Sequence, residues 1–439
     1  MTPGVTWRPA VLLAAGTPVA VLLPAPGWYA LGLALLVLLV CGLDLALAGA
    51  TGDLALTRDG DRQVRLGESA TVTLTVTNQG VRPVRLDLRD AWVPSAGAVP
   101  AGHRALLDPG DTVRLDATLT PTRRGDRPAV RVTPRSYGPL GFAYRQQSGR
   151  RARAGTPQWT LRVLPRFDSR RLLPEKMARL RVIDGMVVIR GRGQGTEFDT
   201  LREYVLGDDV RSIDWRASAR RADVVVRTWR PERDRRVVCV LDTGRTCAAR
   251  VGDEPRLDAA IDAALLLATL ASRAGDRVDL LAVDTRVRAA VAAGSSRTLL
   301  PRLAAALAPL EPALVETDFG LVVGEVLRRV RKRALVVLFS ALEPGALGEG
   351  LLPVLSQLTA RHTVLLAAVR DPELTGLVRS RGDVAGVYTA AAAARTLAER
   401  DRVRGALSRG GVAVVDEPVP AFASAVADAY LAMKAAGRL

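Results

Sequence analysis

The sequence predicts a multidomain protein with an N-terminal transmembrane helical hairpin, a small β-sandwich and a C-terminal Rossmann-like α/β domain. Two apolar runs precede residue 51, β-branched residues then alternate at period two, and apolar strands alternate with helices towards the C-terminus. We therefore expect a membrane anchor in residues 1–52, a sandwich in 53–165, a linker with a charged segment in 166–235, and the α/β domain in 236–439.

The first apolar run, Ala10–Leu23, and the second, Trp28–Ala50, predict helices at about 9–24 and 28–50. The second run is long enough to cross a bilayer core of about 30 Å. Arginines flank the pair while the intervening turn is uncharged, so the positive-inside rule places both ends and the bulk of the chain in the cytoplasm. A signal-peptide core at Ala10–Leu23 is the alternative.

The β-sandwich is predicted by segments such as Ala70–Asn78, ATVTLTVTN, which alternate along the chain and are separated by turn residues. Residues 147–157 are rich in Arg, Gly and Ala and are expected to form a loop. We find no cluster with obvious chemistry in this domain, so it is expected to space or dock.

The α/β domain begins with Arg236–Leu241, a continuous apolar run typical of a strand buried on both faces. Strands and helices alternate after it, which predicts a mostly parallel sheet covered on both sides. Function in such sheets collects at the carboxyl ends of the strands. That rule singles out Asp242, Asp284 and Ser340.

The composition excludes several classes of function. The formal charge of +17 comes almost entirely from Arg in a chain rich in Ala, Gly, Leu and Val, a bias typical of GC-rich genomes. We therefore predict no nucleic-acid partner. The three cysteines lack metal-ligand spacing and the two histidines lack acidic or cysteine neighbours, which argues against zinc sites and most histidine-based catalysis.

The segment from Arg190 to Arg230 is dense in Arg, Asp, Glu and Gly and carries two tryptophans. Its glycines, Gly191 to Gly195, fit close backbone turns better than a phosphate loop, because no Lys-Ser/Thr follows. Its charged and aromatic residues predict an ion-pair and docking surface, with a catalytic acid pair as the alternative. The candidate docking residues are Glu197, Arg202, Glu203, Tyr204, Gly207, Asp208, Asp209, Arg211, Asp214, Trp215 and Arg220.

These residues resemble a known family. The stretches Gly195-Thr-Glu-Phe198, Leu201-Arg-Glu-Tyr204, Gly207-Asp-Asp209 and Arg211-Ser-Ile-Asp-Trp215 look like the bacterial domain of unknown function 58. The strand ending at Asp242 resembles the start of the von Willebrand factor type A-like domain in such proteins. The resemblance covers about Leu161 to the C-terminus and implies a membrane-anchored protein, often paired with an AAA+ ATPase of the MoxR type.

The resemblance also implies a metal site, because type A domains often bind Mg²⁺ through a DxSxS loop, a Thr and a later Asp. Asp242 matches here, Thr246 can replace the second Ser, and Thr317 matches the loop Thr. Gly244 replaces the first Ser and Ala341 replaces the Asp, so the site is degenerate. Asp318 or Glu343 could compensate, and the alternative is a retained fold whose site has lapsed.

The sequence thus predicts a membrane-anchored interaction or scaffold protein, in assembly, maturation or envelope-related processes, whose α/β domain binds a protein partner. No catalytic constellation is found, no small-molecule substrate is predicted, and Mg²⁺ is the one cofactor suggested. The alternative function is a metal-assisted hydrolase that uses Asp242 with Asp208 or Asp209.

Overall fold

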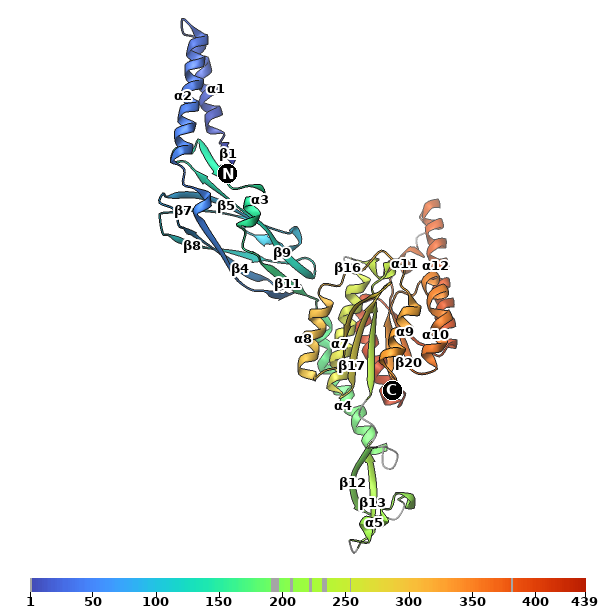
Figure 1. Cartoon of the computed structure of the whole chain (residues 1–439). Coiled ribbons are helices and arrows are strands. Elements are labelled where there is room, and N and C mark those ends of the chain that lie inside the picture. Colours follow the sequence, from blue (N-terminus) through green and yellow to red (C-terminus); the bar gives the residue numbers. More distant parts are fainter. Residues whose placement is uncertain are drawn as a thin grey trace. The chain divides into compact units, whose positions relative to one another are not determined.

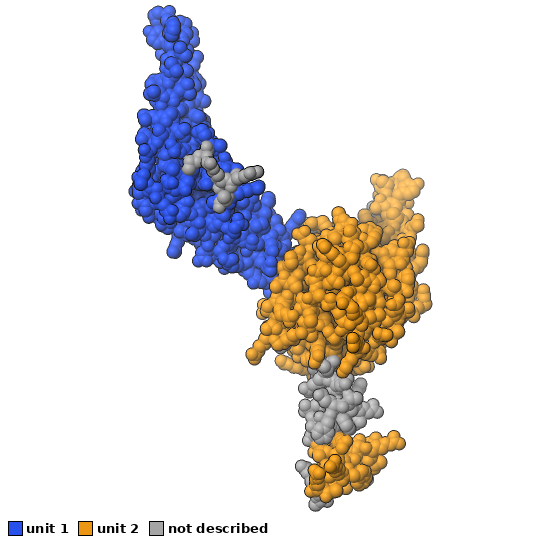
Figure 2. Space-filling model, in the orientation of Figure 1, with its two compact units in different colours: residues 1–164 blue, residues 165–439 orange. Residues whose placement is uncertain are grey.

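The computed structural model divides the chain into two compact units, residues 1–164 and 165–439 (Figure 2). The structure describes residues 2–190, 197–205, 208–220, 223–230, 235–252, 254–379 and 382–439. Each unit has its own buried apolar clusters, so each can be understood from its own sequence.

Two apolar helices follow the first short strand of the first unit and lie side by side (Figure 1). Helix α1 spans Arg8–Val21 and α2 spans Pro26–Leu47, so both end earlier than the predicted 24 and 50. Proline is favoured in the first turn of a helix, which explains why α2 begins at Pro26 rather than at residue 28. Of the described helices, α2 alone is long and apolar enough to cross a membrane, and α1 is shorter.

Two sheets form the sandwich of the first unit. The order β2-β4-β8-β6 makes one sheet, and β1-β10-β9-β11-β3, with β5 pairing β9 and β7, makes the other. Alternate residues of β4 are buried, as the period-two pattern predicts. The strands are β1 (Thr2–Val5), β2 (Leu54–Gly60), β3 (Gln63–Arg65), β4 (Ala70–Asn78), β5 (Val84–Trp92), β6 (Ala98–Val99), β7 (Gly102–Leu107), β8 (Thr112–Leu119), β9 (Gly125–Tyr137), β10 (Ala143–Gln146) and β11 (Thr160–Leu164).

Within the expected loop at 147–157 the structure has a short helix, α3 (Gly149–Ala154). The Thr156 hydroxyl closes it by donating to the Ala152 carbonyl at 2.6 Å and accepting from the Val132 backbone N–H at 2.9 Å. The tract is therefore tied to β9 by a buried side chain that its composition does not reveal.

The end of α2 is fastened to the sandwich by one buried carboxylate. Asp44 has no exposed surface and accepts backbone N–H groups from Leu140 at 2.7 Å, Phe142 at 2.7 Å and Ala143 at 2.9 Å. Buried carboxylates are stable only when such donors replace water. Asp44 is therefore a structural clamp between α2 and the turn before β10.

A six-stranded sheet, as far as the structure is described, forms the centre of the second unit, in the order β18-β17-β14-β19-β20-β21. All neighbouring pairs are parallel except β17 and β18, which are antiparallel. The strands are β14 (Arg236–Asp242), β17 (Arg277–Val283), β18 (Val287–Val291), β19 (Leu335–Phe339), β20 (Thr363–Val369) and β21 (Ala413–Glu417). Strands β14, β17, β19 and β20 are buried on both faces, as their apolar runs predict.

Helices cover both faces of this sheet, giving two buried clusters. One cluster draws on α4 (Leu173–Arg190), α7 (Arg256–Arg273), α8 (Ser296–Leu307) and α13 (Val419–Ala435). The other draws on α9 (Phe319–Arg329), the π-helix Ala346–Leu351, α10 (Leu352–Thr359) and α12 (Val384–Arg409). Short helices α6 (Arg245–Ala248) and α11 (Pro372–Leu377), and the strand pair β15 (Arg250–Val251) and β16 (Glu254–Pro255), complete this unit's α/β part.

The charged segment forms a separate two-stranded sheet within the second unit, from β12 (Glu197–Glu203) and β13 (Val225–Arg230). Between these strands lie a 3-10 turn at Val210–Ser212 and the short helix α5 (Trp215–Ser218). We call residues 197–230 the signature hairpin.

Candidate functional site

The strand order of the second unit creates one topological switch point. Counting along the chain from β14, the order of the sheet is 3-2-1-4-5-6, and the connections leave in opposite directions on either side of β14 and β19. Ligands of open α/β sheets bind outside the carboxyl ends of the strands at such a point. Asp242 ends β14 and Ser340 follows β19, so both lie at this position.

Asp242 is the centre of a buried hydrogen-bond cluster, and its side chain has 2% of its surface exposed. Its Oδ1 accepts the backbone N–H of Gly244 at 2.8 Å and the hydroxyl of Thr317. Its Oδ2 accepts the hydroxyls of Ser340 at 2.6 Å and Thr246 at 3.3 Å. The structure thus brings together all three sequence-predicted metal residues, and four donors surround one carboxylate. We call these five residues the Asp242 cluster.

A second buried carboxylate lies at the end of the neighbouring strand β17. Asp284 accepts the Thr243 hydroxyl at 3.2 Å and the Arg286 backbone N–H at 3.1 Å, and its Oδ2 lies 3.4 Å from a guanidinium nitrogen of Arg288. These contacts join the loop after β14 to the turn after β17. Asp284 therefore holds the loop after Asp242 in place, but its partners are not the hydroxyls that donate to Asp242.

Gly244 occupies the position of the first Ser of the type A motif, and the reason is steric. A Cβ at this residue would lie 2.2 Å from the Thr317 hydroxyl, 2.9 Å from the Val315 carbonyl oxygen and 3.1 Å from Asp242 Oδ1. Contacts under 3.0 Å with backbone cannot be relieved cheaply. Thr317 thus approaches Asp242 through the space that a serine side chain would fill.

The Asp242 cluster does not fit a divalent cation of the type A kind. Mg²⁺ prefers several hard oxygens including carboxylates, but the cluster contains one carboxylate, and Ala341 stands where a second is expected. The hydroxyls of Thr246, Thr317 and Ser340 all donate to Asp242, so this one carboxylate already accepts a hydrogen bond from each of them.

Neither candidate substitute carboxylate joins the cluster. Asp318 begins α9 and accepts the Leu321 backbone N–H at 2.8 Å, so it serves as a helix cap. Glu343 is 40% exposed and lies 4.0 Å from a guanidinium nitrogen of Arg256. Arg256 in turn donates to the Thr246 carbonyl at 3.3 Å, which places a positive charge next to the cluster. That charge opposes cation binding and stabilises the single carboxylate.

Ion pairs within the signature hairpin hold its own turns together. Asp208 pairs with Arg202 at 2.5 Å and accepts the Val205 backbone N–H at 3.0 Å. Asp214 pairs with Arg227 at 2.8 Å and caps α5 by accepting from Arg216 and Ala217. Those backbone hydrogen bonds, with help from Arg227, lower the pKa of Asp214. These two ion pairs join residues of the hairpin to one another and hold its turns in place.

The other predicted docking residues divide by exposure. Asp209 caps the 3-10 turn by accepting the Arg211 N–H at 2.9 Å, and Tyr204 is half-buried. Glu203, Arg211 and Arg220 are exposed, as is Trp215 with 68% of its surface accessible. Gly207 lies outside the described residues, and so does the side chain of Glu197, whose backbone belongs to β12. Trp215 is therefore a surface aromatic and not an internal anchor.

The strand-end rule named Asp284 and Ser340, but the motif left both out of the metal set, and it gave no sign of Thr243. Ser340 contacts Asp242 directly, and Thr243 links Asp284 to the same loop. What identifies these residues in the sequence is their position directly after a strand, because hydroxyls and carboxylates that follow parallel strands meet at one edge of the sheet. The motif does not single out Ser340 because the Asp that it expects after this strand falls one residue later, at Ala341.

The sheet order and the switch-point cluster define a Rossmann-like domain of the von Willebrand factor type A-like class. Residues 200–409 match the profile of the family described as "Protein of unknown function DUF58". Residues 200–409 therefore resemble a domain of this family, in line with the motifs quoted from the sequence.

Curated relatives carry no assigned activity. Uncharacterised proteins of Mycobacterium bovis and Mycobacterium tuberculosis are each 31% identical over 189 residues, covering 41% of this chain. The chain spans 56% of the length of these relatives.

Two solved structures are similar at low scores. The VWA domain of SpRpn10 is 11% identical, covering 44% of this chain and 94% of its own, with a TM-score of 0.28. A CARDB domain from Pyrococcus furiosus is 16% identical, covering 25% of this chain and 94% of its own, with a TM-score of 0.18. At these scores neither likeness bears on function.

Proposed function

We propose that this chain is a membrane-anchored, cytoplasm-facing interaction protein whose α/β domain binds a protein partner, an AAA+ ATPase of the MoxR type. The membrane anchor is the pair α1 and α2, whose outer surfaces carry many exposed apolar side chains. The cytoplasmic orientation rests on the flanking arginines. The partner class rests on family resemblance, and the contact surface rests on the structure.

One observation carries the proposal: segments that follow the carboxyl ends of the sheet strands carry exposed apolar side chains. After β20 ends, the chain forms α11 and the start of α12, where Val384, Val387 and Tyr388 are all exposed, Tyr388 by 74%. Their spacing puts them on one face of the helix. Exposed apolar faces of this kind mark protein contacts. We call these three residues the α12 face.

A second apolar side chain lies on the loop next to the cluster. Leu314 is 85% exposed, between Ala313, which donates to the Thr243 carbonyl at 2.7 Å, and Val315, which accepts from the Arg245 N–H at 2.8 Å. These backbone bonds hold the loop against the Asp242 loop. Leu314 is thus presented on an ordered support, which lowers the entropic cost of binding a partner.

The hydrolase alternative has no supporting observation among the described residues. Asp242, Asp208, Asp209 and Asp214 all accept hydrogen bonds that shape the fold. Both described cysteines of the α/β domain are buried, and burial raises the pKa of the Cys239 thiol to about 12. A thiol with so high a pKa is not a nucleophile near neutral pH.

The test is photo-crosslinking of the full chain in membranes, with the crosslinker placed near the α12 face. An AAA+ ATPase should be captured by the wild type and by Val81→Ala, which alters an exposed valine of the other unit. Capture should be lost in the double variant Val387→Ala/Tyr388→Ala. Equal capture by the double variant would remove the α12 face from the proposal, and absence of any ATPase from all samples would remove the partner.

A further inference from the structure

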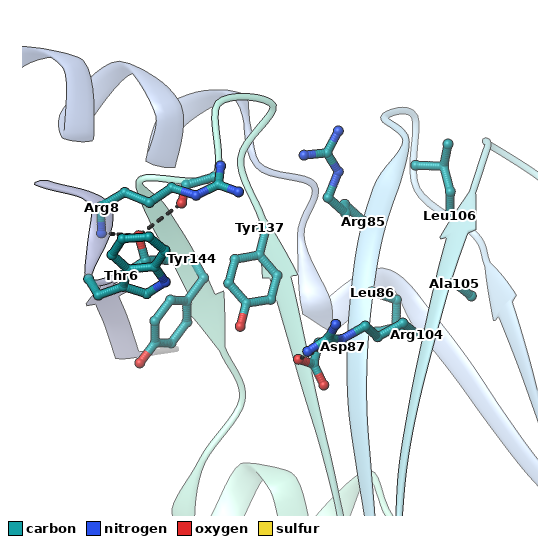
Figure 3. Close-up of a pocket in the computed structure, with 12 residues that line it drawn as sticks. Thr6, Arg8, Arg85, Leu86, Asp87, Arg104, Ala105, Leu106, Tyr137 and Tyr144 are labelled. Carbon is teal, nitrogen blue, oxygen red and sulfur yellow. Dashed lines mark hydrogen bonds and ion pairs between the residues drawn. The ribbon is translucent and has the colours of Figure 1, made fainter. Parts of the chain in front are cut away.

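A pocket of about 710 Å³ opens in the first unit beside the start of α1 (Figure 3). Its walls come from the junction of β1 and α1, from β5 and β7, and from the ends of β9 and β10. In Figure 3, Thr6, Arg8 and Tyr144 lie on one side, Tyr137 lies between, and Arg85, Asp87 and Arg104 lie on the other. Nothing in the proposed partner binding uses this pocket.

The lining carries more positive than negative charge. The lining holds three arginines, Arg8, Arg85 and Arg104, and a single carboxylate, that of Asp87, whose Oδ2 lies 3.7 Å from the Nε of Arg104. Arg8 donates to the Leu140 carbonyl at 2.8 Å, and Arg85 donates to the Pro139 carbonyl at 3.3 Å. A guanidinium has five N–H donors, so each of these bonds orients the group and leaves further donors for a ligand. The arrangement suits an anion with several oxygens.

The position of the pocket points to the source of that anion. Trp7 lines it, is 71% exposed and immediately precedes α1, and tryptophan is enriched where helices enter a membrane. The end of α2 is held at the same end of the sandwich, because Arg145 donates to the Leu45 carbonyl at 3.0 Å and Arg82 donates to the Ala46 carbonyl. If α1 and α2 lie in a bilayer, the pocket opens at headgroup level.

We propose that this pocket binds the phosphate of an anionic phospholipid headgroup, through Arg8, Arg85 and Arg104, with Trp7 lying at the bilayer surface. The inference rests on the proposed membrane anchoring and adds a lipid preference to it. A planar guanidinium group can donate two hydrogen bonds to two oxygens of one phosphate. Three arginines around one pocket therefore suit phosphate better than they suit an anion held by charge alone. The lipid would fix the depth of the sandwich relative to the bilayer.

The experiment is a titration of short-chain phosphatidylglycerol into the detergent-solubilised full chain, with bound lipid counted by native mass spectrometry. The test variant is Arg85→Gln/Arg104→Gln, since both side chains are exposed on the surface of the unit. The matched control is Arg89→Gln/Arg114→Gln, two exposed strand arginines of the same unit outside the pocket. Each basic group near an anionic lipid contributes roughly a fivefold change, so the test variant should bind about 30-fold more weakly.

Phosphatidylcholine of the same chain length should bind weakly to all three proteins. Equal binding of phosphatidylglycerol by the test variant and the control would overturn the proposal. Equally tight binding of inorganic phosphate would identify a free anion as the ligand and also overturn it. Fractionation of cells separates a failure of the membrane anchor from a failure of the lipid pocket. A chain found outside membranes contradicts the anchor, whereas a membrane-bound chain without lipid preference contradicts only the pocket.

Discussion

The Ser340 hydroxyl, at the end of β19, donates to Oδ2 of Asp242, at the end of the adjacent β14, over 2.6 Å. Both side chains are buried, so this bond replaces water that the carboxylate has lost. We predict that Ser340→Ala lowers the free energy of unfolding by about 1.5–3 kcal/mol, the range for hydrogen bonds to charged groups. Urea denaturation measures the change. Ser295→Ala, at an exposed hydroxyl, should change it by less than about 0.5 kcal/mol.

Gly244→Ser restores the type A motif and should nevertheless destabilise the protein. The new Cβ would meet the Thr317 hydroxyl at 2.2 Å, and overpacking of this kind costs about 1–3 kcal/mol. The double variant Gly244→Ser/Thr317→Ala should recover part of the loss, because it removes the nearest contact but not the Val315 carbonyl. Thermal unfolding of the two variants checks this. A stable Gly244→Ser single variant would contradict the steric explanation.

Magnesium should not stabilise the wild-type chain. A ligand that binds only the folded state raises the unfolding midpoint, and at 100 times its dissociation constant the gain is about 2.7 kcal/mol. Because the Asp242 cluster holds one carboxylate and the Arg256 guanidinium lies beside it, we expect no shift of the midpoint with added Mg²⁺. A midpoint that rises in the wild type but not in Asp242→Ala would show that the site binds metal.

Asp262, on α7, should make the second unit less stable as the pH rises towards 6. Burial raises the pKa of this carboxyl from 3.8 to about 6. The folded chain therefore holds a proton that the unfolded chain has lost between these values. The stability contributed by the protonated form is complete below the unfolded pKa and is lost as the pH rises through the folded pKa.

The neutral variant Asp262→Asn keeps an oxygen to accept the Ser169 N–H, which lies 3.3 Å from the carboxylate. It should therefore unfold at a higher temperature than the wild type at about pH 8, with the difference disappearing near pH 4. Calorimetric scans across this range test the expectation. Asp401→Asn, at a carboxylate that is 75% exposed, serves as the control and should show no such trend. A difference that does not vary with pH would exclude Asp262 as its source.

The strands and helices of the α/β part could largely be predicted from the sequence, because continuous apolar runs indicate buried strands and amphipathic patterns indicate helices. The apolar run Arg236–Leu241 became the central β14, and its following Asp242 lies at the switch point as expected. Strand β18 gives only a weak signal in the sequence, since VRAAV is short and alternately buried. Helix α12 begins at Val384 because the Asp383 side chain caps it by accepting the Gly386 N–H at 2.6 Å.

The position of the Asp242 cluster could be predicted from the sequence, but the contacts within it could not. Sequence placed Asp242, Thr246 and Thr317 together by resemblance, and the structure shows that all three meet. It could not show that Thr317 uses the space left by Gly244, because that contact joins residues 73 positions apart along the chain. The pocket at α1 was equally hidden, since its arginines come from three distant segments.

Asp44 gives the first unit a mechanical property that a flexible linker would not. The carboxylate holds the outgoing end of α2 to the turn before β10, and the N-terminal strand β1 pairs with the same β10 along four residues. The helical pair is thus attached to the sandwich at both of its ends, through β1 before α1 and through Asp44 near the end of α2. A rotation of α2 relative to the sandwich would have to break the three hydrogen bonds of this buried carboxylate.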